Sequence, residues 1–237
     1  SFCWCPEDYK IQVSFDLQGT NYPGEDYKPY SQNWEDVDKQ LTREESKSFG
    51  ANLLWRNPYI EEIRELSRSG NLDFNKKVIG TFQLLKQKFS WNGEYKLYSE
   101  NLDKVLKTGT GSNADLNFIF IGMLKSFGIK AYPVVMSRRS AGMLPVSFPS
   151  LQKLNTFVVA IYDEVKGKYV YLDGSMDIPA LNVLPVELSV TKARILSADI
   201  PENKKWVNLQ EIPTNQIFMK ISANAQGNQI TGRRTTI

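Results

Sequence analysis

A glycine-rich segment before an apolar run is the part of this sequence best suited to chemistry. Residues 109–115 read Gly-Thr-Gly-Ser-Asn-Ala-Asp. At the start of a helix, backbone N–H groups and the helix dipole stabilise a thiolate or bind an anion. This segment offers Ser112 and Asn113 where a nucleophile would stand, and it lacks the lysine of a phosphate-binding loop. A glycine-dependent turn, with Ser112 as helix cap, is therefore the simpler interpretation.

The chain contains no histidine, the commonest general base and metal ligand in proteins. Mechanisms that pair Ser or Cys with His are therefore excluded. The two cysteines, Cys3 and Cys5, lie two residues apart, which is too few ligands for a metal site and a spacing that strains a disulfide. We expect no metal site and no cofactor, and we interpret both thiols as structural.

Composition narrows the range of partners. The net charge over 237 residues is only +3 and the basic residues are scattered, so we expect no nucleic-acid partner. No apolar run approaches the roughly 20 residues of a membrane-spanning helix, so we expect no membrane span.

Helical periodicity extends from Trp34 to Ser126. We expect three of its helices to begin at or just after Asn57, Asp73 and Ser99, which are capping residues. The helix over residues 113–127 differs from the others because it is apolar on nearly every side. This pattern predicts a buried central helix.

Strand patterns dominate the rest of the chain. The expected strands cover residues 10–17, 129–136, 156–162, 168–172, 205–209 and 216–222. Pro133 places the donor side of its strand at an edge or a bulge, and we expect the loop over residues 137–149 to border a groove. Helices followed by strands predict an α+β fold with an antiparallel sheet packed on the central helix.

Three segments share the order and spacing of a known family. Residues 111–115 (Gly-Ser-Asn-Ala-Asp) lead to residues 123–131, and residues 155–159 (Asn-Thr-Phe-Val-Val) and 169–173 (Tyr-Val-Tyr-Leu-Asp) follow. Together they resemble the transglutaminase-like superfamily, whose papain-like core carries a Cys at the start of the central helix, a His on one strand and an Asp on the next. Asn113 takes the Cys position, Asn155 takes the His position, and Asp173 keeps the Asp.

The resemblance extends from Trp34 to about Pro185 and is strongest for a module of large exported bacterial proteins that carry β-sandwich domains on either side. It implies a transglutaminase-like core over residues 33–200. It also implies a β segment of an upstream domain over residues 1–32 and a β segment leading to a downstream domain over residues 201–237. The implied location is periplasmic or at the cell surface.

Asparagine cannot replace either reactive group, because a carboxamide is a poor nucleophile and does not accept a proton near neutral pH. We therefore expect no intact catalytic site, and a catalytically inactive domain with a binding or scaffolding role toward a peptide or carbohydrate ligand. The candidate ligand-binding residues are Trp91, Tyr95, Ser112, Asn113, Arg138, Asn155 and Asp173. Of these, Trp91 and Tyr95 are aromatic faces next to the expected site.

Two alternatives stay open. One is an active peptidase or amide hydrolase with a non-standard site that uses Ser112 or Asp173. The other is a structural spacer that binds nothing. Convergence of Asn113, Asn155 and Asp173 in an open groove would favour binding, whereas burial with internal hydrogen bonds would favour a structural role.

Overall fold

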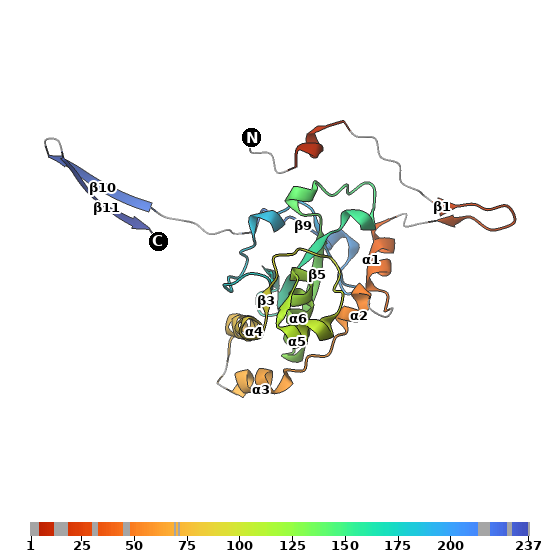
Figure 1. The fold of residues 1–237 in the computed structure, drawn as a ribbon, viewed down its shortest axis with the longest axis horizontal. Coiled ribbons are helices and arrows are strands. Elements are labelled where there is room, and N and C mark those ends of the chain that lie inside the picture. Colours follow the sequence, from red (N-terminus) through yellow and green to blue (C-terminus); the bar gives the residue numbers. More distant parts are fainter. Residues whose placement is uncertain are drawn as a thin grey trace.

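The computed structural model describes residues 5–11, 19–29, 33–44, 48–68, 70, 72–212, 219–226 and 229–236. Most of the strand expected over residues 10–17, together with Cys3, lies outside these ranges. The described chain has an α+β fold in which helices precede a curled antiparallel sheet (Figure 1). The expected fold class is therefore confirmed. Among the described residues, no helix has the length and apolar character needed to cross a membrane.

The central helix is α6 (Asn113–Ser126), and its boundaries agree with the predicted range to within one residue. Ser112 caps it through a capping box, in which the Ser112 hydroxyl and the Asp115 carboxylate each bind the other residue's backbone N–H. Every residue from Asn113 to Leu124 is buried. Gly122 lets the helix approach Trp55 so closely that a Cβ there would lie 2.6 Å from the indole ring. The sequence thus folds as a core helix because no face of it is polar enough to remain in water.

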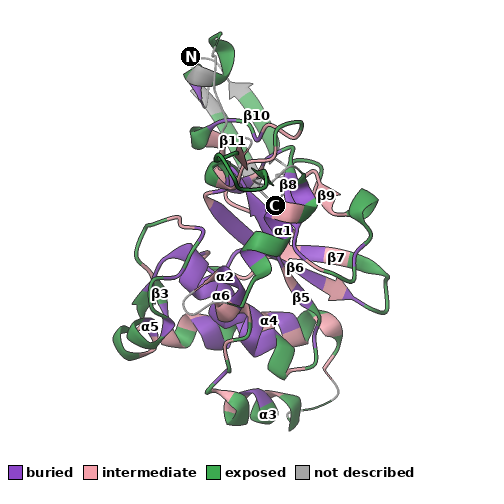
Figure 2. Ribbon diagram, turned by 90° about the vertical axis from the view of Figure 1, so that its right-hand side faces the viewer, coloured by how far each residue is buried: buried purple, intermediate pink, exposed green. Residues whose placement is uncertain are grey.

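The main sheet has the strand order β7-β6-β5-β8-β9, and all neighbouring strands are antiparallel. Its strands are β5 (Ala131–Met136), β6 (Thr156–Asp163), β7 (Lys168–Leu172), β8 (Ala193–Ile195) and β9 (Trp206–Val207). One face packs against α6 through side chains that include Phe157, Val159 and Ile161. The opposite face is covered by Leu188, Ile200 and Leu209 from the later part of the chain. Figure 2 shows burial concentrated where α6 meets these strands.

Pro133 lies on β5, which has β6 on one side and β8 on the other, so β5 is not an edge strand. The nitrogen and carbonyl of one strand residue face the same neighbouring strand. The Pro133 carbonyl accepts the N–H of Leu196, one residue after β8 ends. The nitrogen of Pro133 thus faces the end of the β5–β8 ladder, which extends only to the pair Val134 and Ile195, so the donor side of Pro133 does lie where strand pairing stops, as expected.

The remaining helices surround α6. They are α1 (Trp34–Thr42), α2 (Phe49–Leu53), α3 (Ile60–Arg68), α4 (Phe74–Lys88) and α5 (Leu102–Thr108). Asp73 caps α4 as expected. The expected starts at Asn57 and Ser99 are wrong: α3 begins at Ile60, and Asn101 caps α5. The Asn57 side chain instead accepts the N–H of Tyr59 in the turn before α3.

Short elements complete the described chain. The 3-10 helices are η1 (Pro6–Tyr9), η2 (Arg139–Ala141), η3 (Leu151–Lys153), η4 (Val186–Leu188) and η5 (Glu202–Lys204). Two small sheets join β1 (Gly19–Thr20) to β2 (Lys28–Pro29) and β3 (Ser90–Trp91) to β4 (Thr110–Gly111). The β3–β4 pair holds the segment containing Trp91 against the start of α6.

The C-terminal strands β10 (Met219–Gln226) and β11 (Gln229–Thr236) form an antiparallel hairpin with its own two-stranded sheet. Figure 1 shows this hairpin standing away from the main body. β10 overlaps the strand expected over residues 216–222, although residues 216–218 lie outside the described ranges. The division of the chain at residues 32 and 200 stays a prediction.

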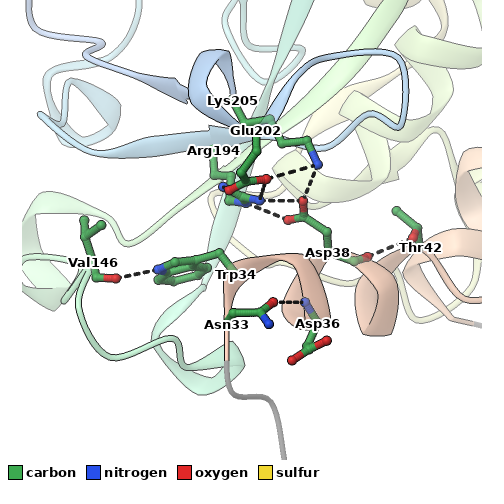
Figure 3. A network of polar contacts seen from close by, with 9 residues as sticks. All are labelled: Asn33, Trp34, Asp36, Asp38, Thr42, Val146, Arg194, Glu202 and Lys205. Carbon is green, nitrogen blue, oxygen red and sulfur yellow. Dashed lines mark hydrogen bonds and ion pairs between the residues drawn. The ribbon is translucent and has the colours of Figure 1, made fainter.

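A charged network ties the first described α-helix to the last strands of the main sheet (Figure 3). Arg194, which is fully buried, donates from Nε and Nη2 to the two oxygens of Asp38 at 2.7 and 2.8 Å. Its Nη1 and Nη2 donate to Glu202, each at 2.7 Å. Lys205 also donates to Asp38, at 2.9 Å. Paired carboxylates make a buried guanidinium tolerable in the core, so this network fixes α1 on β8.

Candidate functional site

Asn113 lies at the first position of α6 and is fully buried. Its Nδ2 donates to the Thr156 hydroxyl at 2.6 Å and to the Phe157 carbonyl at 3.3 Å. Its Oδ1 accepts the backbone N–H of Lys96 at 2.7 Å. The carboxamide thus joins α6, the start of β6 and the segment before α5, and both of its polar atoms are hydrogen-bonded within the protein.

Asp173 directly follows β7 and is also fully buried. Its Oδ1 accepts a hydrogen bond from Asn117 Nδ2 at 2.9 Å, and its Oδ2 accepts one from the Ser175 hydroxyl. Burial raises the pKa of Asp173 from its ordinary value of 3.8 to about 6, although the hydrogen bonds from Ser175 and Asn117 and the nearby Lys86 act in the opposite direction. This carboxylate is therefore held by α6 and by its own loop.

Asn155, just before β6, faces a different part of the molecule. Its Oδ1 accepts the backbone N–H of Arg138 at 3.0 Å, and its Nδ2 lies 3.5 Å from the Ser137 hydroxyl. The three positions that the resemblance singled out, Asn113, Asn155 and Asp173, thus have separate sets of partners and do not converge in one site. Asn113 and Asp173 both lie along α6, whereas Asn155 holds the loop after β5.

Sequence reasoning missed two residues of this region, Thr156 and Asn117. Asn117 follows Asn113 by four residues, so both side chains lie on one side of α6. Its Nδ2 also donates to the Phe157 carbonyl at 2.7 Å, and its Oδ1 accepts the Gly174 N–H at 2.6 Å. Two asparagines four residues apart in an otherwise apolar helix are a signal from which Asn117 could have been identified as a second polar residue of this region. By contrast, nothing in the sequence distinguished Thr156 from its neighbour Asn155 as the contact of Asn113.

Ser112 is nearly buried, with 2% of its surface exposed. Its hydroxyl donates to Asp115 Oδ2 at 2.7 Å, and its backbone N–H donates to the same oxygen at 2.8 Å. A pocket of about 230 Å³ borders this helix start. Among the described residues, its lining includes Ser112 and Asp115 but none of Asn113, Asn155 and Asp173. Asp115 holds the Ser112 hydroxyl in a capping geometry, and an acceptor of this kind is a weak general base compared with a histidine or a lysine.

Trp91, Tyr95 and Arg138 form a stack of three half-buried side chains, called here the aromatic–arginine stack. The ring centroids of Trp91 and Tyr95 lie 5.0 Å apart, and the Arg138 guanidinium carbon lies 5.3 Å from the Tyr95 centroid. The Trp91 indole N–H donates to the Glu94 carbonyl at 3.0 Å. Two segments distant in sequence, on either side of α6, therefore meet in this stack.

Two carboxylates, Asp173 and Glu187, lie near Tyr95. Burial raises the pKa of Tyr95 to about 12, and the negative charges of Asp173 and Glu187 add to this effect, while Arg138 and the neighbouring Ser175 oppose it. Tyr95 consequently stays protonated through the neutral range. Tyr95 thus connects the half-buried Trp91 and Arg138 with the buried residues Asp173 and Ser175.

Lys86, on the last turn of α4, is half-buried, and its enclosed Nζ lies near Asp173 and Asp177. Its Nζ lies 3.9 Å from Asp177 Oδ1 and has no hydrogen-bond acceptor among the described residues. Burial lowers the pKa of Lys86, whereas Asp177 and Asp173 act to raise it. Among the described residues, no group of three or more His, Cys, Asp or Glu side chains is arranged to hold a metal ion.

Comparisons with known proteins add little to this geometry. No family model matches the chain, and no curated protein matches it. A solved structure of a "putative protease" from Parabacteroides distasonis is similar over 78% of this chain, with 15% sequence identity and a TM-score of 0.48. The matched region covers 34% of that protein, so the chain spans about a third of its length. A likeness this remote does not assign an activity.

Proposed function

We propose that this chain is a catalytically inactive transglutaminase-like domain that acts as a binding or scaffolding module of a larger exported bacterial protein. The observation that carries the proposal is the carboxamide of Asn113. It occupies the position that the resemblance gives to the nucleophile, and its hydrogen bonds to Lys96, Thr156 and Phe157 occupy both of its polar atoms. A carboxamide in this state offers neither a nucleophile nor a base.

Asn113 and Asp173 are buried and hydrogen-bonded within the protein, which by the criterion above favours a structural role for these two side chains. The support for a binding role comes instead from the segments that the two asparagines hold. Asn113 accepts the N–H of Lys96, one residue after Tyr95, and Asn155 accepts the N–H of Arg138. Side chains at the former nucleophile and base positions thus fix the two segments that carry the aromatic–arginine stack. Aromatic and arginine side chains are common anchors of binding surfaces. The stack is therefore the proposed contact for a peptide or carbohydrate ligand.

The wider context is proposed on two grounds. The resemblance is to modules of exported bacterial proteins that have neighbouring β-sandwich domains. In addition, an isolated two-stranded hairpin is marginally stable in water, so the β10–β11 hairpin is better explained as a part of a neighbouring β domain. These domains of the same polypeptide are the proposed structural partners.

Measuring catalysis by wild type and by rebuilt sites tests the inactive state. The wild type, Asn113→Cys/Asn155→His and Asn113→Cys/Thr156→His are incubated with a broad peptide and amide library, and products are followed by mass spectrometry. Thr156→His is included because Thr156, not Asn155, contacts Asn113. Asn113→Ala and an inert protein of similar size are the controls. We expect no turnover by the wild type or by Asn113→Ala.

Wild-type turnover above the inert-protein background would overturn the proposal. If that turnover disappeared in Ser112→Ala or Asp173→Asn, the alternative of a hydrolase with a non-standard site would replace it. Activity gained only by a rebuilt variant would support the proposal, because it would place the loss of catalysis at the substituted asparagines.

A further inference from the structure

Arg138 is a cation without an internal counterion in the described part of the chain. None of the ion pairs among the described residues involves it. Its Nε is enclosed with no hydrogen-bond acceptor among these residues. The neighbouring carboxylate of Glu187 accepts hydrogen bonds from the backbone and hydroxyl of Ser140 instead. The guanidinium therefore makes no ion pair and donates no hydrogen bond among the described residues, although Asp173 and Glu187 lie near the ring of Tyr95.

The position of this guanidinium is fixed by its surroundings. Asn155 holds the backbone N–H of Arg138 at 3.0 Å, and the Ser137 hydroxyl donates to the Gly142 carbonyl at 2.8 Å, which closes the loop. The guanidinium lies over Tyr95 at 5.3 Å. Because Nε is enclosed, a ligand would meet the edge formed by Nη1 and Nη2, whose two N–H donors match the two oxygens of a carboxylate.

The neighbouring rings add an apolar surface. Trp91 lies 5.0 Å from Tyr95, and its indole N–H is bound to the Glu94 carbonyl, so its orientation is fixed. A ligand that places a carboxylate on Arg138 thus finds an aromatic face beside it. An acidic group next to an apolar side chain is a feature of many peptides.

We propose that the aromatic–arginine stack binds a carboxylate-bearing peptide, with the carboxylate on the guanidinium edge of Arg138 and an adjoining apolar side chain on Trp91 and Tyr95. This assignment rests on the proposed binding function and specifies its ligand class. The carboxylate comes either from the peptide C-terminus or from an internal Asp or Glu. Asn155 acts as a positioning residue for Arg138.

The test uses N-acetylated pentapeptides of Ala, Leu and Phe in three forms, and isothermal titration calorimetry with the whole chain. One form has a free C-terminus, the second has an amidated C-terminus and an internal Glu, and the third is amidated with Gln in place of that Glu. We expect binding of one or both carboxylate forms, at least tenfold tighter than the Gln form and weakened by added salt. The form that binds identifies the source of the carboxylate.

Variants localise the effect. Arg138→Ala should weaken binding of the carboxylate peptide by about tenfold or more, because a charge-assisted pair is lost. Arg138→Lys keeps the charge but not the planar edge, and should lose part of the affinity. Arg139→Ala, on the next residue of the same loop, is the matched control and should bind as the wild type does. Thermal melts confirm that each variant is folded.

Three results would overturn this assignment while leaving the inactive state untouched: equal binding of all three peptides, undiminished binding by both Arg138 variants, or binding of a trigalacturonate probe but of no peptide. Turnover of any peptide by the wild type would instead contradict the proposed function itself. The two failures are therefore distinguishable.

Discussion

Replacing Asp173 with Asn should remove one component of the pH dependence of stability. Asp173 is fully buried, and burial raises its pKa from 3.8 to about 6. Each unit of pKa difference between the folded and unfolded states corresponds to about 1.4 kcal/mol, so the full effect is about 3 kcal/mol. Because the side chain is fully buried, solvent screening does not reduce this value. The Asn variant keeps an acceptor for Asn117 and has no ionisable group at this position.

The direction follows from which state holds the proton. Well below pH 3.8, the Asp173 carboxyl is protonated in both states, and its contribution to stability is fully present. As the pH rises, the unfolded chain releases its proton first, and the folded protein loses this contribution until the pH has passed about 6. Relative to Asp173→Asn, the wild type should therefore become less stable by about 2.4 kcal/mol between pH 4 and pH 7, because the unfolded carboxyl is already partly ionised at pH 4.

Urea denaturation at half-unit pH steps from 4 to 7, followed by tryptophan fluorescence, measures this difference. In thermal melts, this difference should change the gap between the two midpoints by about 5 to 10 °C for a domain of this size. Asp26→Asn, at an exposed aspartate, is the control and should show a nearly constant gap. A gap between wild type and Asp173→Asn that varies by less than about 1 kcal/mol over this range would refute the reasoning.

Further predictions concern the buried ion pair of Asp38 and the packing of two helical glycines. Asp38→Ala removes the bidentate partner of the buried Arg194 and should lower the free energy of unfolding by about 3 kcal/mol. This is the lower end for a broken buried pair, because the Glu202 carboxylate remains on the guanidinium. An unchanged urea midpoint would show that the network is not stabilising. Gly122→Ala should destabilise by about 1 to 2 kcal/mol, because overpacking against Trp55 exceeds the gain in helix propensity. Gly80→Ala, whose Cβ would have no neighbour nearer than 3.8 Å, should instead stabilise the protein by up to about 1 kcal/mol. Both glycine variants are measured by urea denaturation, and free-energy changes of equal sign in Gly122→Ala and Gly80→Ala would contradict this account.

Local patterns predicted the central part of the fold well. The range of α6 follows from a capping serine and an uninterrupted apolar run, and the range of β7 from a short alternating segment between charged and glycine residues. In both cases the decisive interactions lie within a few residues along the chain. Trp91, Tyr95 and Arg138 were named from the sequence as candidate ligand-binding residues, and the structure places Tyr95 against both Trp91 and Arg138; their ligand-binding role stays a prediction.

Features that depend on distant partners were not predicted. The strand Ala193–Ile195 has an arginine at its centre, and this is compatible with a buried strand only because Asp38 lies against it. Similarly, the resemblance placed Asn113 and Asn155 in one site, whereas the structure gives Asn113 the hydroxyl of Thr156 and gives Asn155 the backbone of Arg138. Adjacent residues on a strand point to opposite faces, so a pattern match cannot fix a contact to better than one residue.

The hairpin of β10 and β11 has a consequence for how the chain behaves in concentrated solution. Within the described residues, each of its strands leaves one edge unpaired, and Ile221 is 66% exposed. Open strand edges are templates for pairing between molecules. Lys220 and Arg233 are exposed on the two strands, so an approaching second hairpin meets like charges. At an ionic strength of about 0.1 M, such repulsion is largely screened beyond about 10 Å, and at higher salt the distance is shorter. We therefore expect this chain to be more prone to self-association at high ionic strength than at low.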